Sequence, residues 1–393
     1  MQIATNSVPF REKQREELFD LLAELVSIPS VNPNYQDGTG ERAITEFIAD
    51  YLNRLDIRVE LQELVPGRPN VVATLPGRDA QRILLLEAHV DTASVEGMAI
   101  PPFRPDIADG VMYGRGSCDT KAGLAGMLYA LRQVRESGRP ATATIILAAT
   151  VDEEYAFGGV ALLVRSGIRA DAAVVAEPTD LDVVVAHKGC LRWRIRTLGR
   201  AAHSAKVHLG INAIVKMSGI IQEIETRLVP RYRKTEHPLL GSPTVNVGLI
   251  SGGVMVNTVP DSSVIEVDRR LLPGEDRESV WAEFSELLDR LKANDPDLSA
   301  MMEPPMLEVH AMETPVGGKI VQIARQASDR VLGRARISGV PYGTDASELN
   351  RAGIQSIVLG PGNIDQAHSA VEYVNLEQVV QACRIYGEIM RAF

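Results

Sequence analysis

The sequence predicts an α/β protein with a mixed, mainly parallel sheet in its larger domain and a ferredoxin-like α+β domain inserted into it. In the first half of the chain, and again after residue 310, short apolar strands alternate with amphipathic helices. Between residues 187 and 310 the expected order changes to β-α-β-β-α-β, the order of a ferredoxin-like unit. We therefore expect residues 1–186 and 311–393 to form one domain and residues 187–310 the other.

Length and composition indicate a soluble protein of two domains. The chain has 393 residues, of which 45% are apolar and 23% charged, as is usual for globular proteins. A net charge of −10 argues against nucleic-acid binding. No apolar run approaches the roughly 18 residues of a membrane helix, and Met1–Leu18 lacks the apolar core of a signal peptide. The three widely spaced cysteines favour a reducing compartment, so we expect a cytoplasmic protein without a membrane partner.

Hydrophobic periodicity gives the elements of the larger domain. Amphipathic helices are expected at Leu18–Leu25, Ile44–Leu55, Leu124–Val134 and Val316–Leu332. Strands are expected at Val59–Leu64, Asn70–Leu75, Ile83–Asp91, Ala143–Val151, Ala172–Ala176 and Ser356–Leu359.

The inserted domain has a different pattern of apolar and polar residues. The segment Leu191–Leu198 alternates apolar and basic residues, as a half-exposed antiparallel strand does. A helix is expected at Ile211–Leu228, strands at Thr244–Ile250 and Ser263–Leu271, and a second helix at Val280–Leu291.

Several strands of the larger domain end in, or just before, side chains that bind metal ions or move protons. Because ligands of open α/β sheets bind outside the carboxyl ends of the strands, we expect these side chains to converge. Zinc accepts imidazole and carboxylate ligands, and two neighbouring ions need one bridging carboxylate. One further carboxylate would remain as a general base. The set is His89, Asp119, Glu153, Glu154, Glu177 and His368.

Other kinds of site are less well supported by the sequence. Strand alternation places His89 and Asp91 on one side, so that one could be a ligand and the other its orienting carboxylate. A buried His–Asp pair of the core is the alternative for these two residues alone. The glycines around Asp119 match neither a dinucleotide nor a phosphate loop, and the sequence has no Gly-x-Ser-x-Gly or His-Glu-x-x-His motif. Cys118 has no identifiable basic partner that would make it a nucleophile.

At these positions the chain resembles the di-zinc amidohydrolase and peptidase family of acetylornithine deacetylase, succinyl-diaminopimelate desuccinylase, aminoacylase-1 and carboxypeptidase G. The motifs that carry the resemblance are His-x-Asp (89–91), Gly-Arg-Gly-x-x-Asp-x-Lys-x-Gly (114–123), Glu-Glu (153–154), Glu-Pro (177–178) and the late His368. The resemblance implies a zinc-peptidase-like catalytic domain with a general base and two metal sites. It assigns His89, Asp119 and Glu177 to the first ion, Asp119, Glu154 and His368 to the second, Asp91 to the orientation of His89, and Glu153 to the base.

The inserted domain resembles the lid and dimerisation domain of that family. His203, in Gly-Arg-Ala-Ala-His-Ser-Ala, corresponds to a histidine that enters the partner subunit's site and steadies the oxyanion, which implies a homodimer. Without the resemblance, the simpler interpretation of His203 is a histidine on the surface. The simpler interpretation of Arg269 and Arg270 is a pair of charged side chains in solvent. Residues that resemble substrate-binding positions are Asn257, Arg270, Gly343, Thr344, Gly360 and Gly362.

We therefore expect a metal-dependent hydrolase that cleaves the amide bond of a small carboxylated N-acyl amino acid. Two divalent ions would hold a bridging water that Glu153 deprotonates. Zinc is the expected metal, and cobalt is the alternative. The alternative within the same class is a di-zinc carboxypeptidase or dipeptidase acting on unmodified peptides. A more distant alternative is a non-catalytic binding protein that retains the fold.

Overall fold

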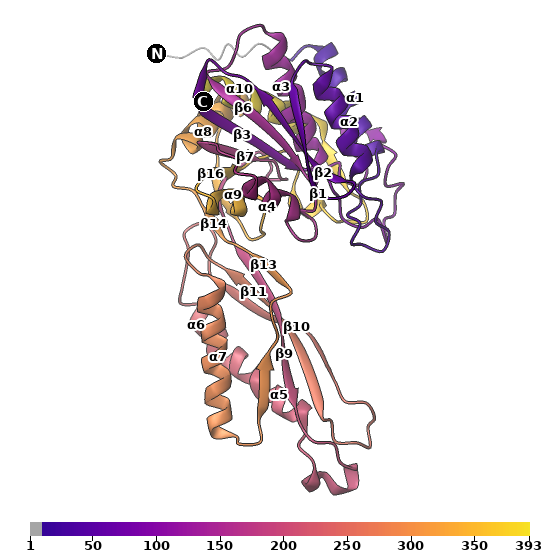
Figure 1. Ribbon diagram of the computed structural model, residues 1–393, viewed down its shortest axis with the longest axis vertical. Helices are drawn as coiled ribbons and strands as arrows, with labels where there is room; N and C mark the ends of the chain where they lie inside the picture. The colour runs from indigo at the N-terminus through magenta and orange to yellow at the C-terminus, as the bar shows by residue number, and fades with distance from the viewer. Residues whose placement is uncertain (1–9) are drawn as a thin grey trace. The chain divides into compact units, whose positions relative to one another are not determined.

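The computed structural model describes residues 10–393, which divide into two compact units (Figure 1). Among these residues the first unit comprises 10–185, 314–338 and 344–393, and the second, inserted unit comprises 186–313 and 339–343. The sequence predicts the inserted domain at residues 187–310. Residues 1–9, part of the segment in which we expect no signal peptide, lie outside the described residues.

The first unit is built on a mixed sheet whose central strands are parallel. The strand order is β1-β2-β6-β3-β7-β16-β8, and the neighbours β6-β3, β3-β7 and β7-β16 run parallel. The bounds are β1 Arg58–Val65, β2 Arg68–Leu75, β3 Asp79–His89, β6 Ala143–Thr150, β7 Ala172–Val175, β8 Val183–His187 and β16 Gln355–Val358. Two further strands, β14 (Met312–Glu313) and β15 (Ile337–Val340), also pair with β8. The predicted fold class is confirmed.

Five helices pack together with one face of this sheet and form the main core (Figure 1). They are α1 Glu12–Ser27, α2 Arg42–Asn53, α3 Lys121–Glu136, α8 Lys319–Leu332 and α10 Leu376–Ala392. Two short helices, α4 (Gly158–Arg165) and α9 (Ala346–Arg351), contact each other and the other side of the sheet. Helix α8 begins three residues later than expected, because Gly317 and Gly318 precede it and glycine is a poor helix former.

A small antiparallel sheet with the order β17-β5-β4 was not predicted from the sequence. Its strands are β4 Ile107–Ala108, β5 Val111–Tyr113 and β17 Tyr373–Asn375. Tyr373 pairs with Tyr113, and Val374 with Met112. This pairing brings the segment that precedes β17, with a 3-10 turn at Ile364–Gln366, beside the glycine-rich loop that follows β5.

The inserted unit has the predicted β-α-β-β-α-β order and the sheet order β10-β11-β9-β12. Its strands are β9 Gly189–Leu198, β10 Thr244–Gly252, β11 Ser262–Leu271, β12 Ser299–Met302 and β13 Leu307–Val309. Its helical segments are a 3-10 turn at Ser204–Leu209, α5 Ala213–Glu223, a π turn at Ile224–Leu228, α6 Val229–Tyr232 and α7 Arg277–Asn294. Trp193, fully buried, meets the ring of Phe284 edge-on at 4.7 Å, so this unit has a core of its own.

The helix expected at Ile211–Leu228 differs from the structure at both ends. It starts at Ala213, because the side chain of Asn212 accepts a hydrogen bond from the Val215 N–H and caps the first turn. It continues past Leu228 through the π turn into α6, where Pro230 stands in the first turn and has no N–H to donate.

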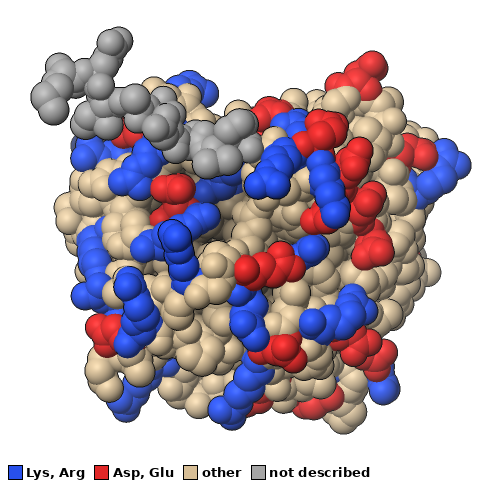
Figure 2. Space-filling view, turned by 90° about the horizontal axis from the view of Figure 1, so that it is seen from above, with Lys and Arg blue, Asp and Glu red and all other residues tan. Residues whose placement is uncertain are grey.

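The surface and the cysteines agree with the composition. Figure 2 shows acidic and basic side chains intermixed on one face of the molecule. Within residues 10–393 no helix combines the length and the apolar character that spanning a membrane requires. Cys118, Cys190 and Cys383 are all buried and free.

Candidate metal centre

Five side chains with metal-binding atoms gather at the carboxyl ends of the parallel strands in the first unit. His89 is the last residue of β3, Glu177 follows β7, and Glu154 follows β6. Asp119 stands in the turn before α3, and His368 in the loop before β17. Segments far apart in the sequence therefore contribute to one site.

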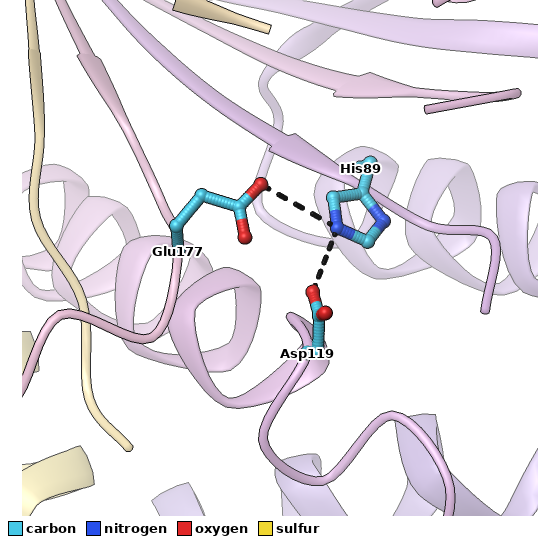
Figure 3. Close-up of side chains that lie close together, drawn as sticks. All are labelled: His89, Asp119 and Glu177. Atoms are coloured by element: carbon cyan, nitrogen blue, oxygen red, sulfur yellow. Dashed lines mark hydrogen bonds and ion pairs between the residues drawn. The ribbon is translucent and has the colours of Figure 1, made fainter. Parts of the chain in front are cut away.

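The first group consists of His89, Asp119 and Glu177, all of them buried (Figure 3). The Nε2 atom of His89 lies 3.0 Å from Oδ1 of Asp119 and 3.6 Å from Oε1 of Glu177. One ligand atom from each residue lies within 4.8 Å of the others. Figure 3 shows both carboxylates turned toward the same ring nitrogen of His89.

The second group consists of Asp119, Glu154 and His368. The Nε2 atom of His368 lies 2.9 Å from Oε2 of Glu154 and 3.4 Å from Oδ2 of Asp119. His368 is the exposed member of the group and has a left-handed backbone with φ of 56°. Asp119 belongs to both groups and turns one carboxylate oxygen toward each, as a bridging ligand would.

The protonation of these groups reflects crowding of buried acids. Burial raises the pKa of Glu177 and of Glu153 well above the usual value. The charge of Asp119 raises the pKa of Glu177 further, and the charge of Glu177 does the same for Glu153. The hydrogen bonds of His368 with Asp119 and Glu154 raise its pKa to about 11. Burial opposes protonation of His89, but the hydrogen bond to Asp119 and the charge of Glu177 outweigh it and raise the pKa.

This donor set fits two divalent cations. Buried carboxylates at such short separations repel one another unless protons or cations lie between them. Each group supplies one imidazole nitrogen and two carboxylates, which are ligands that zinc accepts. The shared Asp119 supplies the bridge that a metal pair requires.

Asp91 contacts the His89 imidazole and also holds the turn that follows β6. Strand β3 ends at His89, so strand alternation does not carry over to residue 91. The His89 Nδ1 atom forms its hydrogen bond with the main-chain oxygen of Asp91, at 3.0 Å, while the carboxylate Oδ1 lies 3.7 Å away. The Asp91 carboxylate also accepts hydrogen bonds from the backbone N–H groups of Glu153 and Glu154, both at 3.1 Å.

A buried polar network behind this turn was missed by sequence reasoning. Asn32 donates through Nδ2 to Asp91 (2.8 Å) and to Asp152 (3.0 Å). Arg68 donates to Asp152 at 2.8 Å and makes a forked ion pair with the fully buried Glu41. Asp152 itself has a left-handed backbone, with φ of 69°. The sequence signal that could have found the network is a set of polar residues inside otherwise apolar surroundings.

Glu153, the expected general base, stands next to Glu154 in the turn that follows β6, and its backbone is held by Asp91. Its negative charge is among the causes that raise the pKa of the His89 imidazole. The position is suited to a proton acceptor beside a metal pair.

His203, Asn257 and Arg270 belong to the inserted unit. The residue pair His203 and Thr258 forms an isolated β-bridge, and the Ser204 N–H donates to the Asn257 carbonyl at 3.0 Å. His203 and Asn257 therefore lie together on one exposed loop region. Arg270 is half-buried and donates to Asp268, whereas Arg269 is fully buried and pairs with Glu275. As strand alternation predicts, only Arg270 lies on the open face of the sheet.

The glycines of the expected substrate loops are required by packing. A Cβ on Gly360 would lie 2.5 Å from the carbonyl oxygen of Glu177, and one on Gly362 would lie 2.5 Å from the Cys118 sulfur. A Cβ on Gly343 would meet Val309, also at 2.5 Å. Thr344 is buried, and its hydroxyl accepts the N–H of Ala346.

Comparison with known proteins agrees with this geometry. The chain is 30% identical to acetylornithine deacetylase from Proteus mirabilis, over 95% of this chain and 96% of that protein. It is 28% identical to N-formyl-4-amino-5-aminomethyl-2-methylpyrimidine deformylase from Bacillus subtilis, over 95% of this chain and 94% of that protein. The aminopeptidase PepT from Bacillus cereus has the same fold, with a TM-score of 0.80, 24% identity, and coverage of 96% of this chain and 98% of that one.

The family model described as peptidase family M20/M25/M40 matches residues 85–392, a range that contains every residue of both ligand groups. The motifs on which the sequence-based resemblance rests lie in the same range. The chain therefore belongs to the M20/M25/M40 peptidase family and is a metal-dependent hydrolase.

Proposed function

We propose that this chain is a two-metal amidohydrolase that removes a small acyl group from the nitrogen of an amino acid. The observation that carries the proposal is the pair of ligand groups joined by Asp119, with Glu153 adjacent in the chain to the ligand Glu154. His89, Asp119 and Glu177 would hold one ion, and Asp119, Glu154 and His368 the other. Zinc is the first candidate and cobalt the second, because imidazole and carboxylate ligands suit both.

When bound at these residues, two divalent ions would lower the pKa of water and polarise the amide carbonyl. Glu153 accepts the proton of the attacking water and later donates it to the departing amine. His203, reaching the site from the partner subunit, donates a hydrogen bond to the negative charge that develops on the carbonyl oxygen. Arg270 pairs with the substrate carboxylate, a charge-assisted contact for which its forked guanidinium is suited.

The substrate class rests on the relatives and on Arg270. Both curated relatives described above are named for the removal of a small acyl group, formyl in one case and acetyl in the other. Arg270 is half-buried, with Asp268 as its partner, and a substrate carboxylate could replace that partner. The alternative is a peptidase acting on unmodified peptides, as the aminopeptidase neighbour is named.

We further propose a homodimer formed through the inserted unit. Strand β10 is at the edge of its sheet, and exposed edge strands are open to pairing with a second chain. Leu249 and Ile250 on this strand are 63% and 58% exposed, and Val254 and Val256 in the following loop are 89% and 103% exposed. A second copy would cover these apolar side chains. The free cysteines support a cytoplasmic location for the dimer.

The first test replaces Glu153 by Gln. If Glu153 is the proton acceptor, turnover should fall by at least about 100-fold, while the metal content after dialysis stays at two ions per chain. Thr92→Val is a matched control, since the Thr92 hydroxyl has no hydrogen-bond partner among the described residues. Normal turnover of Glu153→Gln at full metal occupancy would exclude the role.

The second test concerns the substrate. A panel of formyl, acetyl and succinyl amino acids, their carboxamide analogues and unmodified dipeptides should show highest kcat/KM for an acyl amino acid. Arg270→Leu should lose activity on carboxylated substrates and spare the carboxamides. Faster cleavage of dipeptides would favour the peptidase, and equal loss on all amides would exclude the proposed contact.

The third test concerns the shared site. His203→Ala and Glu153→Gln chains, each inactive alone, should regain activity when refolded as mixed dimers, because one site then has both wild-type residues. Isolated mixed dimers without activity would show that His203 does not act across the interface.

A further inference from the structure

Glu372 contacts the backbone of the shared ligand although it is not a ligand itself. Its side chain is fully buried just before β17, four residues after His368. The Oε1 atom accepts the backbone N–H of Cys118 at 3.0 Å and that of Asp119 at 3.1 Å. The Oε2 atom accepts the Nη1–H of Arg115 at 2.6 Å.

Arg115 and the main chain complete this clamp. The guanidinium of Arg115 is buried and also donates to the Ser94 carbonyl at 2.8 Å. The Gly114 N–H donates to the main-chain oxygen of Glu372 at 3.1 Å. The residue therefore holds the glycine-rich loop through both its side chain and its backbone.

The same residue fixes one end of the His368 loop. Beyond Glu372 the chain enters β17, whose pairing with β5 leaves little freedom at that end. Before it, the Ala370 carbonyl accepts the Ala99 N–H at 2.8 Å. The His368 side chain is 55% exposed, so its position depends on these anchors rather than on burial.

We infer that Glu372 is a positioning residue that sets the spacing between Asp119 and His368 and thereby builds the second metal site. The inference rests on the proposed two-metal function. In the first group, His89 is the last residue of β3 and Glu177 follows β7, so Asp119 is the ligand of that group whose backbone Glu372 holds. In the second group, two of the three ligands depend on it, and only Glu154 does not.

The consequence is a selective effect on one ion. Outer-shell partners of metal ligands typically contribute about 10- to 100-fold in metal affinity. In Glu372→Gln the amide keeps one acceptor oxygen, but its NH₂ group would face either Arg115 or the two backbone N–H groups, so the clamp is broken on one side. We expect the second ion to bind about 10- to 100-fold more weakly, with a smaller change for the first.

The test is stepwise titration of metal-free protein with Co²⁺, followed by visible absorption and by metal analysis after dialysis at graded free Co²⁺. Wild type should bind two ions, and Glu372→Gln should bind the first nearly as wild type and the second more weakly. Tyr373→Phe, the residue next to Glu372, is the control, since it keeps the ring contact between β17 and Tyr113 of β5 and should leave both steps unchanged.

Two outcomes would overturn the inference: wild-type affinity of Glu372→Gln for both ions, or an equal loss for both, which a general structural role would produce. If Glu372→Gln fails to fold, Arg115→Lys replaces it, because it keeps the charge and loses the forked contacts. A selective loss of the second ion in Arg115→Lys then supports the inference, and wild-type binding refutes it. Fewer than two ions on wild type would contradict the proposed function instead.

Discussion

The Asp91→Asn substitution tests whether the Asp91 carboxylate acts on the Glu153–Glu154 turn or on His89. The carboxylate accepts three hydrogen bonds: the N–H groups of Glu153 and Glu154 at 3.1 Å each, and Asn32 Nδ2 at 2.8 Å. Asparagine has one acceptor oxygen, so its NH₂ group would oppose at least one of these donors.

The magnitude follows from the lost bond. A hydrogen bond to a charged group contributes about 1.5–3 kcal/mol, and about 1.4 kcal/mol corresponds to a factor of ten in rate. If the whole loss falls on the position of Glu153, kcat should decrease about 10- to 100-fold. The His89 ring keeps its bond to the residue 91 main-chain oxygen in the variant, so the affinity of the first ion should change little.

The assay is kcat and KM on one acyl amino acid, together with metal content, for Asp91→Asn and for Thr92→Val as the neighbouring control. A variant that loses its metal and recovers full kcat when metal is added in excess would refute the reasoning. That result would mean that the carboxylate acts through His89. An unchanged kcat at full occupancy would refute it as well.

Three further predictions concern stability. Burial lowers the pKa of His187 to about 4, so between pH 7 and pH 5 the unfolded chain binds a proton at this residue and the folded chain does not. The free energy of unfolding in urea should therefore decrease by about 2 kcal/mol more for wild type than for His187→Asn over this pH range. Equal decreases would contradict this prediction. A Cβ on Gly159 would lie 2.1 Å from the Val151 carbonyl oxygen, so Gly159→Ala should destabilise the fold by about 1–3 kcal/mol. Gly219 lies in open space on α5, so Gly219→Ala should stabilise the fold by up to about 1 kcal/mol. Equal stabilities of the two variants in calorimetry would contradict the packing described at Gly159. Removal of metal with a chelator should abolish hydrolysis and lower Tm, since ions that bind only the folded state stabilise it; an unchanged Tm would argue against bound metal.

Much of the fold and of the candidate site could be predicted because the signals are local. Apolar runs ending in His89, Glu154 and Glu177 identify both the strands and the edge at which they end. Parallel pairing of β6, β3 and β7 then brings these side chains to one side of the sheet. Geometry that follows from strand order is accessible to sequence reasoning.

What could not be predicted depends on small shifts or on distant pairing. Strand β3 ends at His89, two residues earlier than expected, and the Asp91 carboxylate contacts the backbone of Glu153 as well as the imidazole. The partners Arg115 and Glu372 are separated by 257 positions, and no local pattern relates them. The small sheet that joins β17 to β5 consists of strands too short to show a period.

The division into units also has a consequence for how the chain is made. Residues 186–313 are continuous in sequence and contain their own core, so they can fold while synthesis proceeds. The first unit is interrupted at the same place. Strand β16 and helix α10 are made after the insertion, and so is His368. During synthesis, His89, Asp119 and Glu177 are made before the insertion, whereas His368 and the Glu372 clamp that holds Asp119 are made after it. The second ligand group can therefore assemble only when the last part of the chain has been made.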